Sequence, residues 1–175
     1  MLIAVIDSRS GPLALASTLG PLVRGVIEGM IGTAVIVSPE ADHDTVSIAD
    51  SSGCRVLAEP VWADGFARAV TNAPGLGILV LEAGLMVGPD FWPILADMLP
   101  VLGNRPAATL PSDGGGWLTR IGIGGVLSGR VSRESALLLP PSLARRISQA
   151  KDDPFRVRYG KECVPLRSMA TRVRL

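Results

Sequence analysis

The chain has 175 residues, of which 47% are apolar, 4% are aromatic and 19% are charged. The apolar content excludes a disordered chain, and the formal net charge of +1 gives no reason to expect nucleic-acid binding. The length predicts a single domain over residues 1–175. The charge is unevenly distributed, because the part from Leu143 onward carries nine basic and three acidic residues. A basic C-terminal part thus follows a mildly acidic body.

Two cysteines and one histidine are too few for a structural zinc site. Cys54 and Cys163 are far apart in the sequence and are typical of small buried side chains in a reducing compartment. The first residues lack the basic stretch of a signal peptide, and no apolar run approaches the roughly 20 residues of a membrane span. These features predict a cytoplasmic protein without a transmembrane segment.

The first half of the chain predicts two strands, each followed by a helix. A buried strand over 2–6 leads into a loop, and helical spacing of apolar residues follows over 19–30. Gly20 and Pro21 predict a kink there, or a helix that starts there. A second strand over 33–37 precedes a helix that Asp42 or Asp44 caps and that ends near Gly53.

The pattern then continues with strands over 55–57, 78–81 and 107–110 and helices over 64–72 and 90–102. Alternating strands and helices predict an α/β fold, a single three-layer domain with a mostly parallel, Rossmann-like sheet. These alternating elements occupy residues 1–110. Residues 111–175 comprise a glycine-rich segment, a strand over 125–131, a helix from about Ser132 and the basic C-terminal part.

In an open parallel sheet, ligands bind beyond the carboxyl ends of the strands. The loops over 7–11, 38–44, 58–65 and 82–89 are therefore the candidates. No GxGxxG motif follows the first strand, and the glycine cluster over 122–125 lacks the Gly-Lys-Ser/Thr of a P-loop. A hairpin or linker is the simpler interpretation of that cluster.

Acidic side chains in two of these loops are candidate ligands. The second loop concentrates Glu40, Asp42, His43 and Asp44, which could hold a divalent ion or ribose hydroxyls. The alternative is a solvated loop in which an Asp caps the next helix. Glu82 ends the most apolar strand, where its carboxylate would face the ligand crevice or be an ordinary loop charge.

Several segments resemble the family 2 glycosyltransferases with the GT-A fold (nucleotide-diphospho-sugar transferase-like), in particular a short, divergent bacterial branch. The similar segments in the first half are IAVI at 3–6, LGPLVRGVIEGMI at 19–31, AVIV at 34–37, DTVSIADSSGCR at 44–55, ILVLEAG at 78–84 and PDFW at 89–92. Looser similarity covers GRVSRE at 129–134 and VPLRSMA at 164–170. The resemblance covers most of the chain.

The resemblance implies that residues 1–110 are the nucleotide-binding half, with a nucleotide-sugar site and a divalent metal, Mg²⁺ or Mn²⁺. At the family's DxD-type motif this chain has Glu82, Ala83 and Gly84, so Glu82 is the implied metal ligand. At the family's Asp-rich turn, Ser38 takes the first Asp position and His43 the later one, with Asp44 shifted by one. Together with the loops at the strand ends and the basic C-terminal part, the resemblance gives these candidate nucleotide-sugar contacts: Asp7, Ser8, Ser38, Glu40, Asp42, His43, Asp44 and Arg158.

The family's catalytic base is an acid in the C-terminal third, where Asp152 and Asp153 form the close pair. They could equally be a helix terminus before Pro154. The arginines Arg156, Arg158 and Arg167 could supply positive charge to a departing nucleoside diphosphate. Alternatively, they form a solvated basic face or a peripheral contact with anionic lipid headgroups.

Three functions remain open from the sequence. The first is transfer of a sugar from a nucleotide-sugar donor to an acceptor. The second is a catalytically inactive GT-A module (a pseudoenzyme) that binds a protein partner or forms a homodimer, because the Asp-rich turn and the DxD-type motif are both incomplete. The third is a nucleotidylyltransferase, for which Asp7 to Gly11 would serve as a reduced phosphate loop.

Overall fold

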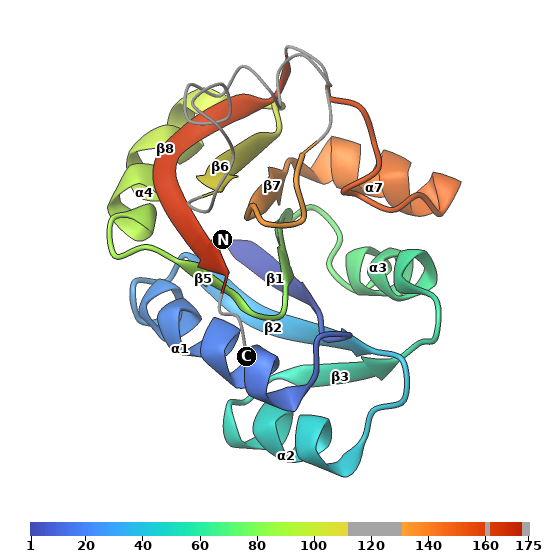
Figure 1. Ribbon diagram of the computed structural model, residues 1–175. Helices are drawn as coiled ribbons and strands as arrows, with labels where there is room; N and C mark the ends of the chain where they lie inside the picture. Colours follow the sequence, from blue (N-terminus) through green and yellow to red (C-terminus); the bar gives the residue numbers. More distant parts are fainter. Residues whose placement is uncertain (112–130, 160–161, 173–175) are drawn as a thin grey trace.

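The computed structural model describes residues 1–111, 131–159 and 162–172, and it contains one eight-stranded sheet with helices on both faces (Figure 1). The strand order is β3-β2-β1-β4-β7-β6-β8-β5. The strands are β1 (Leu2–Asp7), β2 (Ile31–Ser38), β3 (Arg55–Ala58), β4 (Gly77–Glu82), β5 (Leu85–Val87), β6 (Ala107–Pro111), β7 (Leu137–Leu139) and β8 (Val164–Arg172). The described helices are α1 (Pro12–Ile27), α2 (His43–Ser51), α3 (Trp62–Thr71), α4 (Phe91–Leu102) and α7 (Pro141–Ala150).

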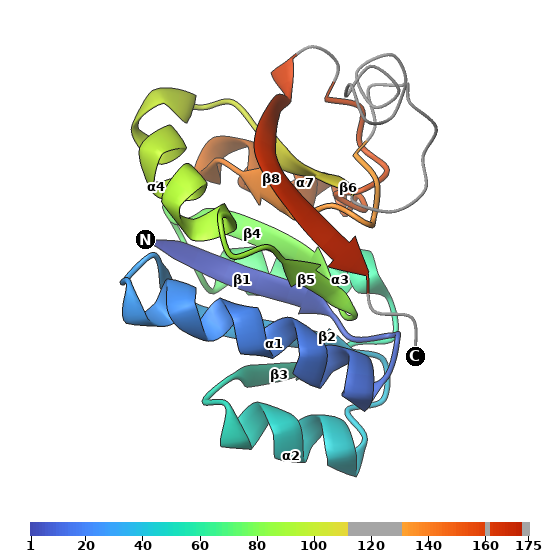
Figure 2. The ribbon, with the colours of Figure 1, turned by 60° about the vertical axis from the view of Figure 1, so that its left-hand side comes forward.

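The sheet is mixed and mostly parallel. β1 pairs in parallel with β2 and β4, β2 pairs in parallel with β3, and β6 pairs in parallel with β8. β7 runs antiparallel to β4 and β6, and β5 runs antiparallel to β8. Figure 2 shows the long β8 between β6 and β5, so the C-terminal segment belongs to the same sheet as the first strand. The predicted three-layer α/β fold is confirmed.

Two apolar cores cover the two faces of the sheet. Alternate side chains of β1 enter different cores: Ala4 and Ile6 pack toward α1 and α4, whereas Ile3 and Val5 pack toward α3 and α7. Because both faces are covered, the central strands are continuously apolar. The layers are visible in Figure 1, where α1 and α4 lie on the left and α3 and α7 on the right.

Two predicted helix starts were wrong. Helix α1 does not start at Gly20 and Pro21, because it begins at Pro12, a position in the first turn that tolerates proline, and continues through Pro21. A kink at Pro21 stays a prediction. No helix starts at Ser132: a turn occupies 133–135, β7 follows, and α7 begins at Pro141. The three leucines of β7 are buried between its neighbours, so a short strand forms there instead of a helix.

Other predictions concern residues that lie partly or wholly outside the described ones. The glycine cluster over 122–125 and the strand over 125–131, apart from Val131, fall in this group. Within the described residues, no helix combines the length and the apolar character that crossing a bilayer requires.

Replacing Gly25 with Ala is expected to lower the free energy of unfolding by about 1–3 kcal/mol, because overpacking is costly. A Cβ at this position would overlap the indole ring of Trp92. The ring cannot easily move, since it is buried and its Nε1 donates a hydrogen bond to the Pro21 carbonyl at 3.0 Å. Urea denaturation checks the expected loss.

Val23→Ala is the control, because Val23 lies in the same helix and is 55% exposed. Its free energy of unfolding should stay within about 0.5 kcal/mol of the wild-type value, as expected for a surface substitution. Equal midpoints for the two variants would contradict the close packing of α1 on α4.

Candidate functional site

Two carboxylates lie side by side at the carboxyl ends of the central strands. Asp7 ends β1 and Glu82 ends β4, and the two residues are register partners in the parallel pairing. The Asp7 side chain is 2% exposed and that of Glu82 is 14% exposed. Buried carboxylates need charged or hydrogen-bonding partners, so their surroundings determine what this end of the sheet can do.

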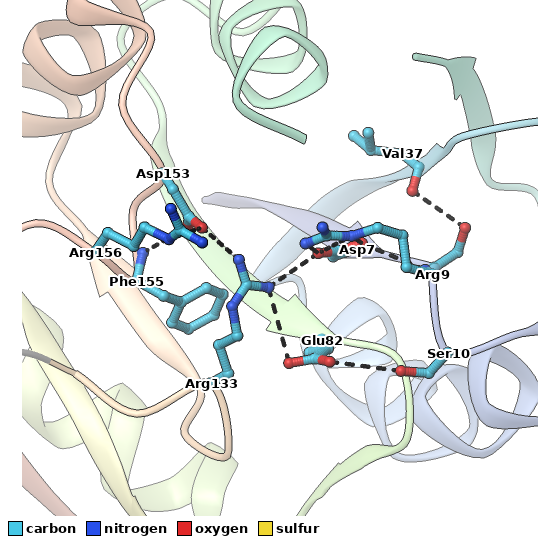
Figure 3. A network of polar contacts seen from close by, with 10 residues as sticks. Asp7, Arg9, Ser10, Val37, Glu82, Arg133, Asp153, Phe155 and Arg156 are labelled. Atoms are coloured by element: carbon cyan, nitrogen blue, oxygen red, sulfur yellow. Dashed lines mark hydrogen bonds and ion pairs between the residues drawn. The ribbon is translucent and has the colours of Figure 1, made fainter. Parts of the chain in front are cut away.

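Arg133 is the shared partner of these acids (Figure 3). It lies in the turn before β7, and its Nη1 is 3.1 Å from Asp7 Oδ2 and 3.9 Å from Glu82 Oε2. Its Nη2 donates to a third carboxylate, that of Asp153. The guanidinium carbon also lies 5.3 Å from the ring centroid of Phe155, within cation–π range. Arg133 therefore connects three acids that are far apart in the sequence.

Asp7 is also bound by Arg9 from the loop that follows β1. Arg9 Nε lies 2.9 Å from Asp7 Oδ1 and 3.0 Å from Oδ2, and Arg9 Nη2 donates to Oδ2 as well. This hydrogen-bonded ion pair raises the pKa of the Arg9 guanidinium. The Arg9 side chain is 46% exposed, so part of its charge faces solvent.

Asp153 reaches the site because the chain reverses after α7. Lys151 adopts a left-handed conformation (φ 53°), and the segment then turns back toward the sheet. The Asp153 carboxylate accepts from the Phe155 backbone N–H at 3.0 Å and lies 3.7 Å from Arg156 Nε. The buried Tyr159 hydroxyl donates to the Pro154 carbonyl at 2.6 Å and holds this segment in place.

Asp152, the other acid of the predicted pair, does not join this group. Its side chain is exposed, and its backbone N–H donates to the Ile147 carbonyl at 3.1 Å, as at a helix terminus. Of the two neighbouring acids that the sequence predicts as catalytic candidates, the structure therefore places Asp153 in the site and Asp152 outside it. Arg158 is exposed.

Ser8 and Ser38 are buried at the ends of β1 and β2. The Ser8 hydroxyl donates to the Val37 carbonyl at 3.1 Å, and the Ser38 hydroxyl accepts from the Ala41 backbone N–H at 3.2 Å. Both hydroxyls thus fix the loops that border the site.

The acidic second loop is solvated. Glu40, Asp42, His43 and Asp44 are all exposed. Asp42 is the N-cap of α2 and accepts from the Thr45 backbone N–H at 2.9 Å and from its hydroxyl at 2.8 Å. These bonds hold the pKa of the Asp42 carboxyl below its usual value. The helix-cap alternative is therefore correct for Asp42, and the ligand-binding role of this loop stays a prediction.

The turn after β4 is bonded through its backbone N–H groups to the end of β1 and to α1. The Ala83 N–H donates to the Asp7 carbonyl at 2.8 Å. The Gly84 N–H bonds to the Ala14 carbonyl at 3.0 Å and to the Thr18 hydroxyl at 2.8 Å, with φ at 94°. Only glycine adopts this φ without strain, so the third position of the DxD-type motif has no side chain to offer a metal.

These residues do not fit the divalent ion that the family resemblance implies. In the part of the chain that the structure describes, no group of three or more His, Cys, Asp and Glu side chains is arranged to hold a metal. The carboxylates of Asp7 and Asp153 instead bond to guanidinium groups, and that of Glu82 faces one. A metal would have to displace those cations before it could bind.

The two cysteines are not part of the site. Burial raises the pKa of the Cys163 thiol to about 11, and burial also raises the pKa of Cys54. Both thiols are therefore protonated near neutral pH and poorly nucleophilic.

The sequence did not single out Arg133, Arg9 or Phe155 as functional residues. Arg133 is 126 positions away from Asp7, and no spacing rule connects residues at that distance. Charge balance is the one available signal, because buried acids at strand ends require cations from elsewhere.

The arrangement of strands and helices is that of a GT-A-like α/β fold. Glucosyl-3-phosphoglycerate synthase from Mycobacterium tuberculosis, in complex with Mg²⁺ and UDP, superposes with a TM-score of 0.67 at 14% identity, over 100% of this chain and 72% of that one. Mannosyl-3-phosphoglycerate synthase from Rubrobacter xylanophilus superposes with a TM-score of 0.67 at 16% identity, over 100% of this chain and 67% of that one. The expected GT-A fold is confirmed.

Another structure of the Mycobacterium tuberculosis enzyme, with Mn²⁺, UDP and glucosyl-3-phosphoglycerate, gives a TM-score of 0.64 at 13% identity, over 100% of this chain and 72% of that one. No family model and no curated protein sequence matches the chain. At these identities the likeness concerns the fold alone.

Proposed function

We propose that the chain binds a nucleotide-sugar at the carboxyl ends of β1 and β4 and transfers the sugar to an acceptor. The observation that carries this proposal is the convergence of Asp7, Glu82 and Asp153 on Arg133 at the edge of the sheet where ligands of open α/β folds bind. Proteins of the same fold have been crystallised with UDP and a divalent metal, which supports a nucleotide-sugar as the ligand class.

In this proposal the acceptor hydroxyl attacks the anomeric carbon of the sugar. The bond between that carbon and the diphosphate oxygen breaks, and the nucleoside diphosphate leaves with the electron pair. Asp153 takes the proton of the acceptor hydroxyl, because it is the acid of the C-terminal third that lies beside the strand ends. Arg9 and Arg156, with side chains 46% and 83% exposed, provide positive charge for the leaving diphosphate.

An inactive GT-A module is the second candidate. The observation that favours it is that the buried carboxylate of Asp7 is already bonded to two arginines, as in a structural ion-pair network. Such a module would act through a protein partner or as a homodimer.

A thermal-shift screen against UDP-, GDP- and dTDP-sugars separates the two candidates. A functional site predicts a melting temperature that rises with ligand concentration, because binding to the native state stabilises it by about 2.7 kcal/mol at one hundred times Kd. No shift with any donor at millimolar concentration, together with a dimer or a partner in size-exclusion chromatography, would favour the inactive module.

A further inference from the structure

Arg133 lies where three carboxylates of the candidate site meet. Its side chain is 30% exposed, whereas those of Asp7, Glu82 and Asp153 are 2%, 14% and 14% exposed. We infer that Arg133 is a fixed internal cation that takes the role of a divalent metal, so that the site binds a diphosphate without one. That the ligand is a diphosphate rests on the proposed function. That the site excludes a divalent metal does not rest on it.

The first argument is that the oxygens of Asp7 are fully used. Oδ1 accepts from the backbone N–H of Arg9 at 3.3 Å and from its Nε at 2.9 Å. Oδ2 accepts from Arg9 Nε and Nη2 and from Arg133 Nη1. A carboxylate has about four lone-pair positions, so Asp7 could ligate a metal only after losing arginine contacts.

The second argument is charge balance. The carboxylates of Asp7, Glu82 and Asp153 are matched by the guanidinium groups of Arg9, Arg133 and Arg156, all joined by ion pairs. The charges of these six described side chains balance, and a divalent cation added to them would lie against Arg133 in a partly buried environment, where repulsion between like charges is weakly screened. An incoming diphosphate would instead meet the exposed parts of Arg9 and Arg156, and guanidinium groups bind phosphate well.

The third argument is that the cation is held in place. The Phe155 ring lies against the Arg133 guanidinium, and the Phe155 backbone orients Asp153 through its N–H. Arg133 therefore has a defined position without any ligand, as a preorganised electrostatic group requires.

Calorimetric titration of the full chain with MnCl₂ alone tests the exclusion of metal. The wild type is expected to show no binding tighter than about 1 mM, and Arg133→Met should bind Mn²⁺ at least tenfold more tightly, because its three carboxylates lose their shared cation. Arg105→Met, which removes an exposed arginine elsewhere, should behave like the wild type.

Micromolar binding of Mn²⁺ by the wild type that Glu82→Gln abolishes would overturn the inference. The inference would also be overturned if the Arg133→Met variant is folded, as judged by circular dichroism, and binds Mn²⁺ no more tightly than the wild type. If that variant does not fold, the Mn²⁺ titrations of the wild type and of Glu82→Gln decide whether the site excludes metal.

Titration with UDP in EDTA and in MnCl₂ tests the role of the arginines. The inference predicts Kd values within twofold of each other in the two buffers. Binding that is more than tenfold tighter with Mn²⁺ would overturn the inference and leave the proposed function standing. Absence of UDP binding in both buffers would contradict the proposed function for a uridine donor, and the titration with Mn²⁺ alone would still decide the exclusion of metal.

Discussion

Replacing Arg133 with Met is expected to lower the free energy of unfolding by about 2–4 kcal/mol, because removing one partner of a buried ion pair leaves charge uncompensated. Asp7 would keep Arg9, but Glu82 and Asp153 would lose the guanidinium that lies between them. The Phe155 ring would also lose its cation. Urea denaturation followed by circular dichroism measures the change.

Arg156→Met is the matched control, because Arg156 also pairs with Asp153 but its side chain is 83% exposed. A change within about 0.5 kcal/mol is expected for such a surface pair. If the two variants lost the same amount of stability, Arg133 would not be the organising cation of the site.

Replacing Asp153 with Asn should lower kcat by about 10²–10⁴-fold in a sugar-transfer assay with whichever donor the screen identifies, as expected for the loss of a general base. The amide keeps the shape of the side chain and can still contact Arg133, so donor affinity should change little. Steady-state kinetics with varied donor and acceptor separates the two effects.

Asp152→Asn provides a sharp control, since it removes a neighbouring carboxylate that is exposed and outside the site. Its kcat should stay within twofold of the wild type. A larger loss for Asp152→Asn than for Asp153→Asn would show that the base has been assigned to the wrong residue.

The central part of the fold could be predicted from the sequence because local patterns determine it. Strands β1 and β4 are buried on both faces and are therefore continuous apolar runs, and Asp42 is a recognisable helix cap. The strands β5, β7 and β8 could not be predicted. β5 and β7 have only three residues each. All three strands form by pairing with partners that are distant in the sequence.

The candidate site was predictable in part. Asp7 and Glu82 were found because parallel strands end at a common edge, a rule that needs only the order of elements. Arg133 was not found, because its role depends on where the turn before β7 lies in space. The exposed group around Asp42 and His43 has the acidic composition of a ligand-binding loop. A solvent-exposed helix cap has the same composition, so composition alone does not distinguish the two.

The central claim is that the carboxyl ends of β1 and β4 form a diphosphate site built on arginines. Titration of ¹⁵N-labelled protein with UDP in EDTA, followed by ¹H–¹⁵N NMR including the arginine Nε–H signals, tests it most directly. We predict shifts of the Arg9 and Arg156 Nε signals and of the Glu82 and Asp153 amides, with the Arg105 Nε signal unchanged. Shifts confined to other residues, or shifts that appear only after Mn²⁺ is added, would contradict the account.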